Sequence, residues 1–429
     1  MRPMQLLCLS DIHIGRQPAR IPADVVEQCG GRPPGPALAW ERAVDLAIER
    51  GVAAVLLAGD VVEQEDDFYE ALRDLRHGVE RLEASGIPVL GVTGNHDVRV
   101  LPRLAERVPG FRLLGAGGVW EEAFIEGGDG ERLRVLGWSF PEPIVRTSPL
   151  AAGLPPRADT PTVGLLHCDR DQPGSAYAPV ASAELAAAPV DAWLLGHIHK
   201  PDALVGARPM GYLGSLTGLD PGETGAHGPW LMTLAGDGHI AMEQIPLAPL
   251  RWAEVAVPVD ELETAEGIHA AVTDALAALH AQLSALARRP DAVGCRLLFT
   301  GRTHLRGAIE RALAADDPRR IPQARDATVY FVHDWRMNVL PAIDLEALAR
   351  GSDPAALLAH KIVVLRGGDS GERRELLASA RRRLDPLPAR RPFHVLGADA
   401  PDEETLAATL ESAALRALDE LLAQHEAGQ

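Results

Sequence analysis

Histidine and acidic side chains occur in five short clusters, each placed directly after an apolar run. The clusters are Asp11-Ile12-His13, Gly59-Asp60, Gly94-Asn95-His96-Asp97, His167 and Gly196-His197-Ile198-His199. Hard divalent cations such as manganese accept carboxylate, amide and imidazole ligands together, whereas structural zinc favours thiolates. The clusters therefore predict a centre for divalent metal ions.

The ligand types are sufficient for two ions. Two ions about 3.5–4 Å apart can polarise a phosphate and generate a hydroxide between them, and one carboxylate must then bridge both. We expect Asp60 to bridge, because Gly59 before it leaves room for close approach. The other ligands form two sets. One set is Asp11, His13 and one of the pair His197 and His199, and the other set is Asn95, His167 and the remaining histidine of that pair. Alternate residues of an extended strand diverge, so His197 and His199 should serve separate ions.

His96 is better placed as a catalytic acid than as a ligand, because Asn95 and Asp97 flank it. It would protonate the leaving alkoxide or hold the phosphate, and a carboxylate would orient its ring. Asp97 and Glu63 are the carboxylates considered for this catalytic group.

A single Asp-x-His or His-x-His motif is more often structural, since short motifs recur by chance. Five clusters in this order, each at the end of an apolar strand, favour a metal site instead. Seven other histidines lie in helical or variable stretches without other potential ligands beside them. We expect these histidines to be solvated or structural. They are His77, His269, His280, His304, His360, His394 and His425.

The elements that must position these clusters alternate between strands and helices. Expected strands at 4–10, 52–58 and 87–93 are separated by expected helices at 37–50 and 66–85. This order is typical of parallel β units, whose ligands collect at the carboxyl ends of the strands.

The pattern changes after the third unit. A hairpin is expected over 119–140, then strands leading into His167 and Gly196 with a helix at 182–188 between them, then short strands over 204–246. These elements together predict a mixed pair of sheets flanked by helices, rather than a plain doubly wound sheet. A β-α-β-α-β order from Arg251 to Trp335 indicates a small α+β domain, and helices are expected beyond it, the last over 401–424.

Length and composition fit a globular protein. The 429 residues are 46% hydrophobic and 24% charged, which allows two or three domains. No run of about 18 apolar residues and no signal peptide pattern is found, so we expect a cytoplasmic protein without membrane contact. The four cysteines have no CxxC pairing and are expected to be reduced.

The formal charge of −18 argues against a nucleic-acid binder, because phosphate contacts need a positive surface. Bound metal ions would neutralise clustered carboxylates, and the positive charge is nearly all arginine, which favours bidentate phosphate contacts. If DNA is the substrate, a partner should supply much of the binding surface. The basic stretch Arg381–Arg391 is more typical of a solvated or partner-facing surface than of a DNA contact.

The ordered series from Asp11 to His199 resembles the calcineurin-like metallophosphoesterase superfamily, up to about residue 245. Three further segments are similar to the SbcD/YhaO-type DNA repair exonuclease subunits. They are Leu9-Ser10-Asp11-Ile12-His13-Ile14-Gly15, Leu165-Leu166-His167 followed by Tyr177-Ala178-Pro179, and Gly196-His197-Ile198-His199-Lys200-Pro201 with a later Gly211-Tyr212-Leu213-Gly214-Ser215.

The resemblance implies an α/β (α+β) fold, a four-layer αββα sandwich with a small α+β capping domain and C-terminal helices. The expected domains are a phosphoesterase domain over 1–248, a capping domain that shapes DNA access over 249–341 and a helical partner-binding region over 342–429. The resemblance also implies the ligand sets Asp11, His13, Asp60 and His199 for one manganese ion and Asp60, Asn95, His167 and His197 for the other. His96 would be the catalytic histidine.

The implied activity is manganese-dependent hydrolysis of DNA phosphodiesters with a metal-bridging hydroxide as nucleophile. The enzyme would be an exonuclease, with endonuclease action on single strands as a further expectation. Its implied partners are DNA and an SMC-like ATPase of the SbcC/YhaN type, bound through the C-terminal helices, and a homodimer is allowed.

Departures from the family pattern keep two alternatives open. After Asp60 only Glu63 remains to orient His96, and Cys168-Asp169-Arg170-Asp171 is more polar than the pattern. Gly218 is followed by Leu219-Asp220-Pro221-Gly222-Glu223, where basic residues are typical. This acidity suits a phosphoesterase for a small phosphodiester or a phosphoprotein. A scaffold that only binds an ATPase is the non-enzymatic alternative.

Overall fold

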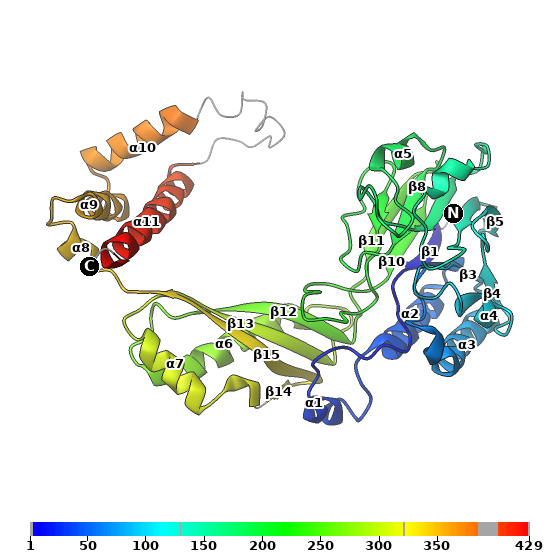
Figure 1. Cartoon of the computed structure of the whole chain (residues 1–429), viewed down its shortest axis with the longest axis horizontal. Coiled ribbons are helices and arrows are strands. Elements are labelled where there is room, and N and C mark those ends of the chain that lie inside the picture. The colour runs from blue at the N-terminus through cyan, green and yellow to red at the C-terminus, as the bar shows by residue number, and fades with distance from the viewer. Residues whose placement is uncertain (1–2, 129, 321, 385–401, 428–429) are drawn as a thin grey trace. The chain divides into compact units, whose positions relative to one another are not determined.

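The computed structural model describes residues 3–128, 130–320, 322–384 and 402–427 (Figure 1). The chain forms two compact units. The first comprises Met1–Gly301 and Gly307–Asn338, and the second comprises Arg302–Arg306 and Val339–Gln429. The expected division at residues 248 and 341 stays a prediction.

The first sheet has six strands in the order β11-β10-β1-β2-β3-β4. Its strands are β1 (Met4–Leu9), β2 (Ala54–Ala58), β3 (Val89–Val92), β4 (Phe111–Leu113), β10 (Trp230–Leu234) and β11 (Ile240–Gln244). Strands β1 to β4 are parallel, and β10 and β11 are antiparallel additions beside β1. The carboxyl ends of β1, β2 and β3 therefore lie at one edge, as the repeated units predicted.

The second sheet has five strands in the order β5-β6-β7-β8-β9. They are β5 (Trp120–Glu126), β6 (Arg132–Trp138), β7 (Thr162–His167), β8 (Ala192–Gly196) and β9 (Met210–Tyr212). Strands β5 and β6 form the expected antiparallel hairpin, and β6 to β9 run parallel. The register places His167 opposite Gly196, so the last two ligand clusters begin at the same level.

One core joins the inner faces of these two sheets. Leu6, Leu56 and Leu90 of the first sheet belong to the same buried cluster as Leu165 and Leu194 of the second. These residues alternate along their strands with neighbours that face the helices, as expected for sheets covered on both sides.

Helices cover the outer faces. Helices α2 (Pro36–Arg50), α3 (Phe68–Ala84) and α4 (Leu101–Ala105) pack on the first sheet, with Trp40 and Leu75 in that core. Helix α5 (Ser182–Ala187) packs on the second sheet through Leu185 against Trp193. The four-layer αββα sandwich predicted from the sequence is confirmed. Short 3₁₀ turns lie at Glu65–Asp67, Pro149–Ala152, Ala265–Gly267 and Pro318–Arg320.

A third sheet follows in the order β12-β13-β15-β14. It consists of β12 (Leu250–Pro258), β13 (Ala292–Arg302), β14 (Gln323–Arg325) and β15 (Thr328–Leu340), with α6 (Ile268–Ser284) and α7 (Arg306–Ala315) between strands. Helix α1 (Ala23–Gln28) was not predicted, because six residues are too short to show a helical period. Its buried Val25 packs with Trp252 and Phe331 of this sheet.

The second unit is helical. It contains α8 (Leu345–Leu348), α9 (Pro354–Arg366), α10 (Gly371–Leu384) and α11 (Glu403–Ala427). Ile362 of α9 and Leu418 of α11 are buried in one small core. Arg381–Arg383 end helix α10, and the rest of the predicted basic stretch lies outside the described residues. None of the described helices is long and apolar enough to cross a membrane.

Arg42 ties helix α2 to the segments that lead into β12 and β13. Its guanidinium is buried, donates to the carbonyl oxygens of Leu247 (3.1 Å) and Arg289 (3.3 Å), and pairs with Asp291 at 2.5 Å. Replacing Arg42 by Met leaves these acceptors without a donor, and we expect a loss of about 1–3 kcal/mol in the free energy of unfolding. Denaturant titration of the full chain measures this loss.

Arg76→Met provides the matched control. Arg76 forms an exposed pair with Glu80 on helix α3, and such a pair contributes about 0.3–0.5 kcal/mol. An equal effect of the two substitutions would contradict the structural role of Arg42.

Candidate metal centre

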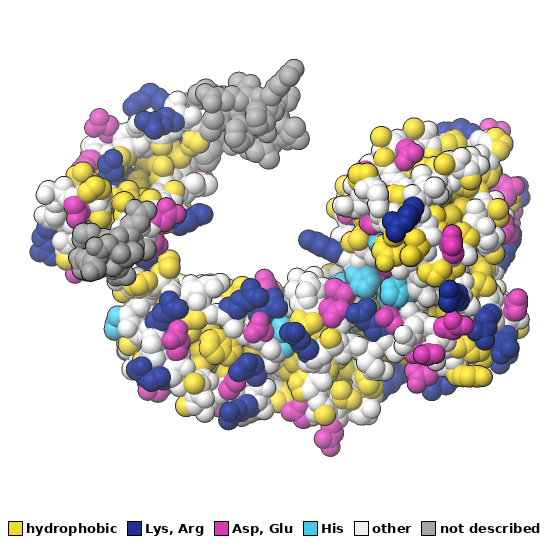
Figure 2. All heavy atoms as spheres, in the orientation of Figure 1, with side chains coloured by type: hydrophobic (Ala, Val, Ile, Leu, Met, Phe, Trp, Pro, Cys, Tyr) yellow, Lys and Arg dark blue, Asp and Glu magenta, His cyan; other side chains and the backbone are white. Residues whose placement is uncertain are grey.

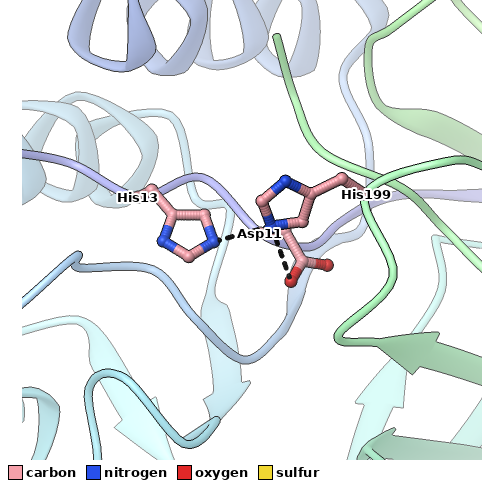
Figure 3. A group of neighbouring side chains, drawn as sticks. All are labelled: Asp11, His13 and His199. Carbon is pink, nitrogen blue, oxygen red and sulfur yellow. Dashed lines mark hydrogen bonds and ion pairs between the residues drawn. The ribbon is translucent and has the colours of Figure 1, made fainter. Parts of the chain in front are cut away.

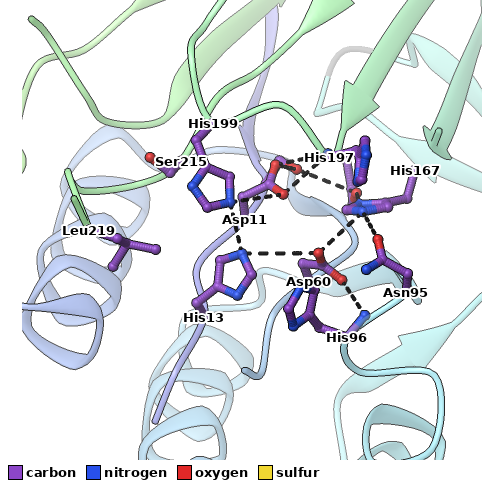
Figure 4. A network of polar contacts seen from close by, with 12 residues as sticks. Asp11, His13, Asp60, Asn95, His96, His167, His197, His199, Ser215 and Leu219 are labelled. Atoms are coloured by element: carbon purple, nitrogen blue, oxygen red, sulfur yellow. Dashed lines mark hydrogen bonds and ion pairs between the residues drawn. The ribbon is translucent and has the colours of Figure 1, made fainter. Parts of the chain in front are cut away.

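The five clusters meet at one place, although they come from two sheets (Figure 4). Asp11 and His13 follow β1, Asp60 follows β2, and Asn95 and His96 follow β3 of the first sheet. His167 ends β7, and His197 and His199 follow β8 of the second sheet. On the surface, Figure 2 shows histidine side chains (cyan) with acidic and basic side chains next to them.

Asp11, His13 and His199 form one group, whose ligand atoms lie within 4.8 Å of one another (Figure 3). The Nε2 atoms of His13 and His199 are 3.1 Å apart, and Nε2 of His199 lies 4.0 Å from Oδ1 of Asp11. Two ring nitrogens and a carboxylate oxygen thus converge on one point. We call this the first ion site, with Asp60 as its fourth predicted ligand.

The second ion site is predicted to comprise Asp60, Asn95, His167 and His197. Nε2 of His167 lies 3.3 Å from Oδ2 of Asp60 and 3.2 Å from Oδ1 of Asn95. The ring of His197 packs edge-on against His167, with 5.3 Å between centroids. His197 is outside the clusters of converging ligand atoms found in the described residues, and its Nε2 lies 3.8 Å from Oδ2 of Asp169.

Asp60 lies between the two sites. Its Oδ2 is 4.0 Å from Nε2 of His13 and 3.3 Å from Nε2 of His167. A Cβ atom added at Gly94 would lie 2.1 Å from Oδ1 of Asp60, so glycine is needed there for the carboxylate to occupy this position. The position is the one that a bridging carboxylate requires.

The backbone is strained at the ligands. Asp11, His13, Asp60 and His197 have φ values of 48°, 55°, 49° and 108°, in the left-handed region that non-glycine residues rarely adopt. Such conformations cost about 1–3 kcal/mol each and persist where the surrounding structure enforces them, commonly at functional sites. Their concentration here supports a site built for binding rather than a structural cluster.

The electrostatics of Asp60 and His167 are linked. Burial by itself would raise the pKa of Asp60, but the charge and hydrogen bond of His167, and then the charges of His13 and His96, hold it well below its usual range. Burial by itself would lower the pKa of His167. The carboxylates of Asp60 and Asp11 have the larger effect and raise this pKa to about 9. Without metal, a proton on His167 neutralises part of the negative charge.

The three residues predicted to be catalytic occupy different surroundings. His96 is exposed, its N–H donates to Oδ1 of Asp60 at 3.0 Å, and its Nδ1 lies 3.1 Å from the carbonyl oxygen of Glu63. Asp97 is fully buried and accepts the N–H groups of Val61 (2.7 Å) and Gly94 (2.8 Å). Burial, and then the charge of Asp60, raise the pKa of Asp97 to about 7.

Glu63 was expected to orient the ring of His96 through its carboxylate, but the structure shows a different contact. Its backbone carbonyl faces His96, whereas its carboxylate lies on His13, with Oε2 at 2.6 Å from Nδ1. Asp97 holds the turn backbone around His96 rather than the ring itself. The orientation of His96 thus comes from a main-chain oxygen, which a search for carboxylates in the sequence could not find.

Glu223 is a residue that the sequence reasoning missed. Its Oε1 lies 2.8 Å from Nδ1 of His199, on the ring side opposite the first ion site. The sequence showed only an acidic segment after Gly218, because the distance of 24 residues hides the contact. Its place shortly after the Gly-Tyr-Leu-Gly-Ser motif was the one available signal.

The donor set suits divalent ions. Asp11, His13, Asp60, His167 and His199 all lie in groups of converging acidic and imidazole atoms, and Asn95 adds an amide oxygen next to His167. Buried carboxylates at such short mutual distances need compensating positive charge. Oxygen and imidazole donors without thiolates fit a hard or borderline divalent cation.

Residues 4–201 match the profile of the calcineurin-like phosphoesterase family. The matched segment contains all five clusters of the centre. The resemblance seen in the sequence is confirmed at this level, and the family uses a dimetal centre. Ligand roles for individual residues stay predictions, and the geometry above is consistent with them.

The uncharacterized metallophosphoesterase YhaO of Bacillus subtilis (strain 168) is 27% identical over 264 residues, which are 60% of this chain and 62% of the relative. The chain thus matches less than two thirds of that relative. The protein TT1561 of Thermus thermophilus is 16% identical, with a TM-score of 0.33 over 56% of this chain and 99% of the other. A dimetal phosphatase from Danio rerio is 14% identical, with a TM-score of 0.36 over 57% and 96%.

The predicted two-ion arrangement implies unequal effects of ligand substitutions on metal content. Replacing His197 or His199 by Ala should each remove about one metal equivalent, because each ring serves one ion, while Asp60→Asn should disrupt both sites. Metal analysis after dialysis against a fixed manganese concentration measures the content, with exposed His77→Ala as control. If the double histidine variant loses no more metal than either single variant, the two-ion assignment is wrong.

The pKa of His167 predicts opposite pH trends with and without metal. In the metal-free protein the raised pKa stabilises the fold fully below pH 6.5, and this stability is lost as the pH rises through about 9. Metal binding needs the neutral ring, so metal affinity should rise across the same interval. Thermal unfolding in chelator and manganese titrations at pH 6.5 and 9 test both signs. If the melting temperature in chelator rises with pH over this interval, protonated His167 does not stabilise the metal-free fold by pairing with Asp60.

Proposed function

We propose that the chain is a manganese-dependent phosphodiesterase that acts on DNA ends, as an exonuclease that also cuts single strands. The observation that carries the phosphodiesterase part is the exposed ring of His96 beside the buried ligand cluster. A reacting phosphate at the cluster would lie next to this exposed imidazole, which can transfer a proton. Manganese is proposed because the donor set combines oxygen with imidazole.

His96 would supply the proton for the leaving oxygen. Its Nδ1 faces the carbonyl oxygen of Glu63, which can only accept a hydrogen bond, so Nδ1 carries a proton. For His96 to act as the acid, its Nε2 would carry a second proton, in the imidazolium form of the ring, and pass it to the leaving oxygen. When bound, two divalent ions would polarise the phosphate and activate water. Asp60 also accepts the backbone N–H of His96, which fixes the distance between the acid and the centre.

An aromatic side chain next to the centre supports a nucleic-acid substrate. The ring of Tyr177 lies 5.1 Å from that of His197 and is 37% exposed. Stacking of a base on an exposed aromatic ring contributes about 1–3 kcal/mol and tolerates any base. Tyr177 also belongs to a segment similar to the SbcD/YhaO type.

A second candidate, a phosphodiesterase for a small phosphodiester or a phosphoprotein, is favoured by charge. Arg16 lies beside Glu63 but pairs with Asp220 at 2.5 Å, so this arginine is already neutralised. The net charge of −18 adds a repulsion that a small substrate would feel less than a DNA duplex. This candidate predicts turnover of a cyclic phosphodiester without DNA degradation.

The helical second unit is the proposed contact for an SMC-like ATPase of the SbcC/YhaN type. Leu357 on helix α9 is 59% exposed, although the rest of its helix buries Ile362 and Ala359. A partner bound at this helix would bury the exposed Leu357 side chain. Such a partner would also supply the positive surface for DNA that this acidic chain lacks. A homodimer of this chain is a further proposal.

The substrate proposal is tested with labelled duplex and single-stranded DNA and with a chromogenic phosphodiester, each with manganese. We expect the wild-type chain to shorten DNA from its ends and His96→Ala to lose about 10²–10⁴-fold in rate, the usual contribution of a positioned acid. His96→Ala should keep its metal content, since His96 is not a predicted ligand.

His77→Ala is the control, because His77 is exposed on helix α3 away from the strand ends. No DNA degradation by the wild type, with or without an SMC-like partner, would reject the DNA proposal. Turnover of the chromogenic ester under the same conditions would then support the second candidate.

A further inference from the structure

The two ion sites differ in what lies behind their histidine ligands. At the first ion site, Nδ1 of His13 lies 2.6 Å from the carboxylate of Glu63, and Nδ1 of His199 lies 2.8 Å from the carboxylate of Glu223. Both rings therefore have a negative charge at the nitrogen that points away from the site. Glu63 and Glu223 come from distant segments, so the arrangement is not one motif used twice.

The second ion site has no equivalent contact among the described residues. Nδ1 of His167 lies 3.0 Å from the carbonyl oxygen of Ala58, which is a neutral acceptor. Asp169 is 3.8 Å from Nε2 of His197, beyond hydrogen-bonding distance, and this oxygen already accepts from Ser175 at 2.6 Å. Apart from the shared ligand Asp60 on Nε2 of His167, the described residues place no carboxylate within hydrogen-bonding distance of the histidines of this site.

Glu63 has little freedom to act elsewhere. Nδ1 of His13 and Oε2 of Glu63 are both buried, and in the described part of the chain neither makes a hydrogen bond of regular geometry, so the 2.6 Å ion pair is what compensates them. Arg16 approaches the same oxygen only to 3.9 Å. The pair is therefore the principal contact of both groups.

Glu223 is held in place from two directions. Its Oε2 accepts the N–H of Leu219 at 2.8 Å and the hydroxyl of Ser215 at 3.4 Å, which leaves Oε1 for His199. The loop that carries it is anchored to Trp252 of β12, whose indole donates to the carbonyl oxygen of Gly218 at 3.3 Å. Gly225 on the other side of Glu223 donates to the carbonyl of the same Trp252 at 3.1 Å.

A carboxylate behind a ligand histidine has a known physical effect. It accepts the Nδ1 proton, which leaves the Nε2 lone pair for the ion and increases the basicity of the ring. Removing such a partner usually weakens metal binding about 10–100-fold. Because only the first ion site has these partners among the described residues, its affinity should exceed that of the second.

We propose that Glu63 and Glu223 are positioning residues that make the first ion site the tighter of the two. The inference rests on the dimetal part of the proposed function but not on its substrate. Through Trp252, the third sheet also supports the loop that holds Glu223. The first ion site would therefore fill before the second as the metal concentration rises, with or without substrate.

The test is a direct manganese titration of the metal-free full chain, in which electron paramagnetic resonance counts the free ion. We expect two classes of site in the wild type. Glu63→Gln and Glu223→Gln should each weaken the tighter class about 10–100-fold and leave the weaker class within about twofold, because Gln keeps the shape and removes the charge. Glu223→Ala should weaken it at least as much.

Asp169→Asn is the matched control, since it removes a carboxylate near His197 of the second site and should leave the tighter class unchanged. Unfolding of each variant in chelator identifies a misfolded one, and either glutamate variant alone then still tests the proposal. One class of site in the wild type, or Gln variants that weaken both classes equally or neither, would overturn it. Loss of DNA activity with an unchanged titration would count against the proposed substrate alone.

Discussion

The structure depends on a buried carboxylate, Asp60, that must have positive charge on both sides. Imidazoles from two different sheets reach it, His13 at 4.0 Å from one and His167 at 3.3 Å from the other. A buried carboxylate without such partners would be strongly unfavourable. The two sheets therefore have to pack with their carboxyl strand ends aligned, and the shared core of β1, β2, β7 and β8 side chains keeps them in that alignment.

Close approach of the strand ends has a steric consequence at two glycines. A Cβ atom at Gly94 would meet Asp60, and one at Gly196 would lie 2.1 Å from the carbonyl oxygen of Ala58. The left-handed φ values of Asp11, His13, Asp60 and His197 occur at the same strand ends. The fold thus uses its packing energy to maintain an arrangement that suits metal ions.

The third sheet is linked to the chemistry through its first strand. Trp252 contacts both ends of the loop that carries Glu223, and Arg42 joins the same region to helix α2. A domain expected to shape access to the site therefore also supports one of its ligands. The acidic residues after Gly218, which weaken the case for a DNA substrate, have a local function in this arrangement.

The sequence by itself determined the strand-end clusters, the α/β character and the mixed pair of sheets, because ligand types, apolar runs and turn residues are local signals. The four-layer sandwich was implied by the family resemblance. It predicted the ligand candidates that the structure brings together from Asp11 to His199. It did not show helix α1, the contact between Glu223 and His199, or the use of the Glu63 carbonyl for His96. The Glu223 contact and the Glu63 carbonyl were decided by the tertiary structure, because they join residues far apart in the chain or use main-chain atoms that every residue type carries. The short helix α1 depends on tertiary packing through Val25 against the third sheet.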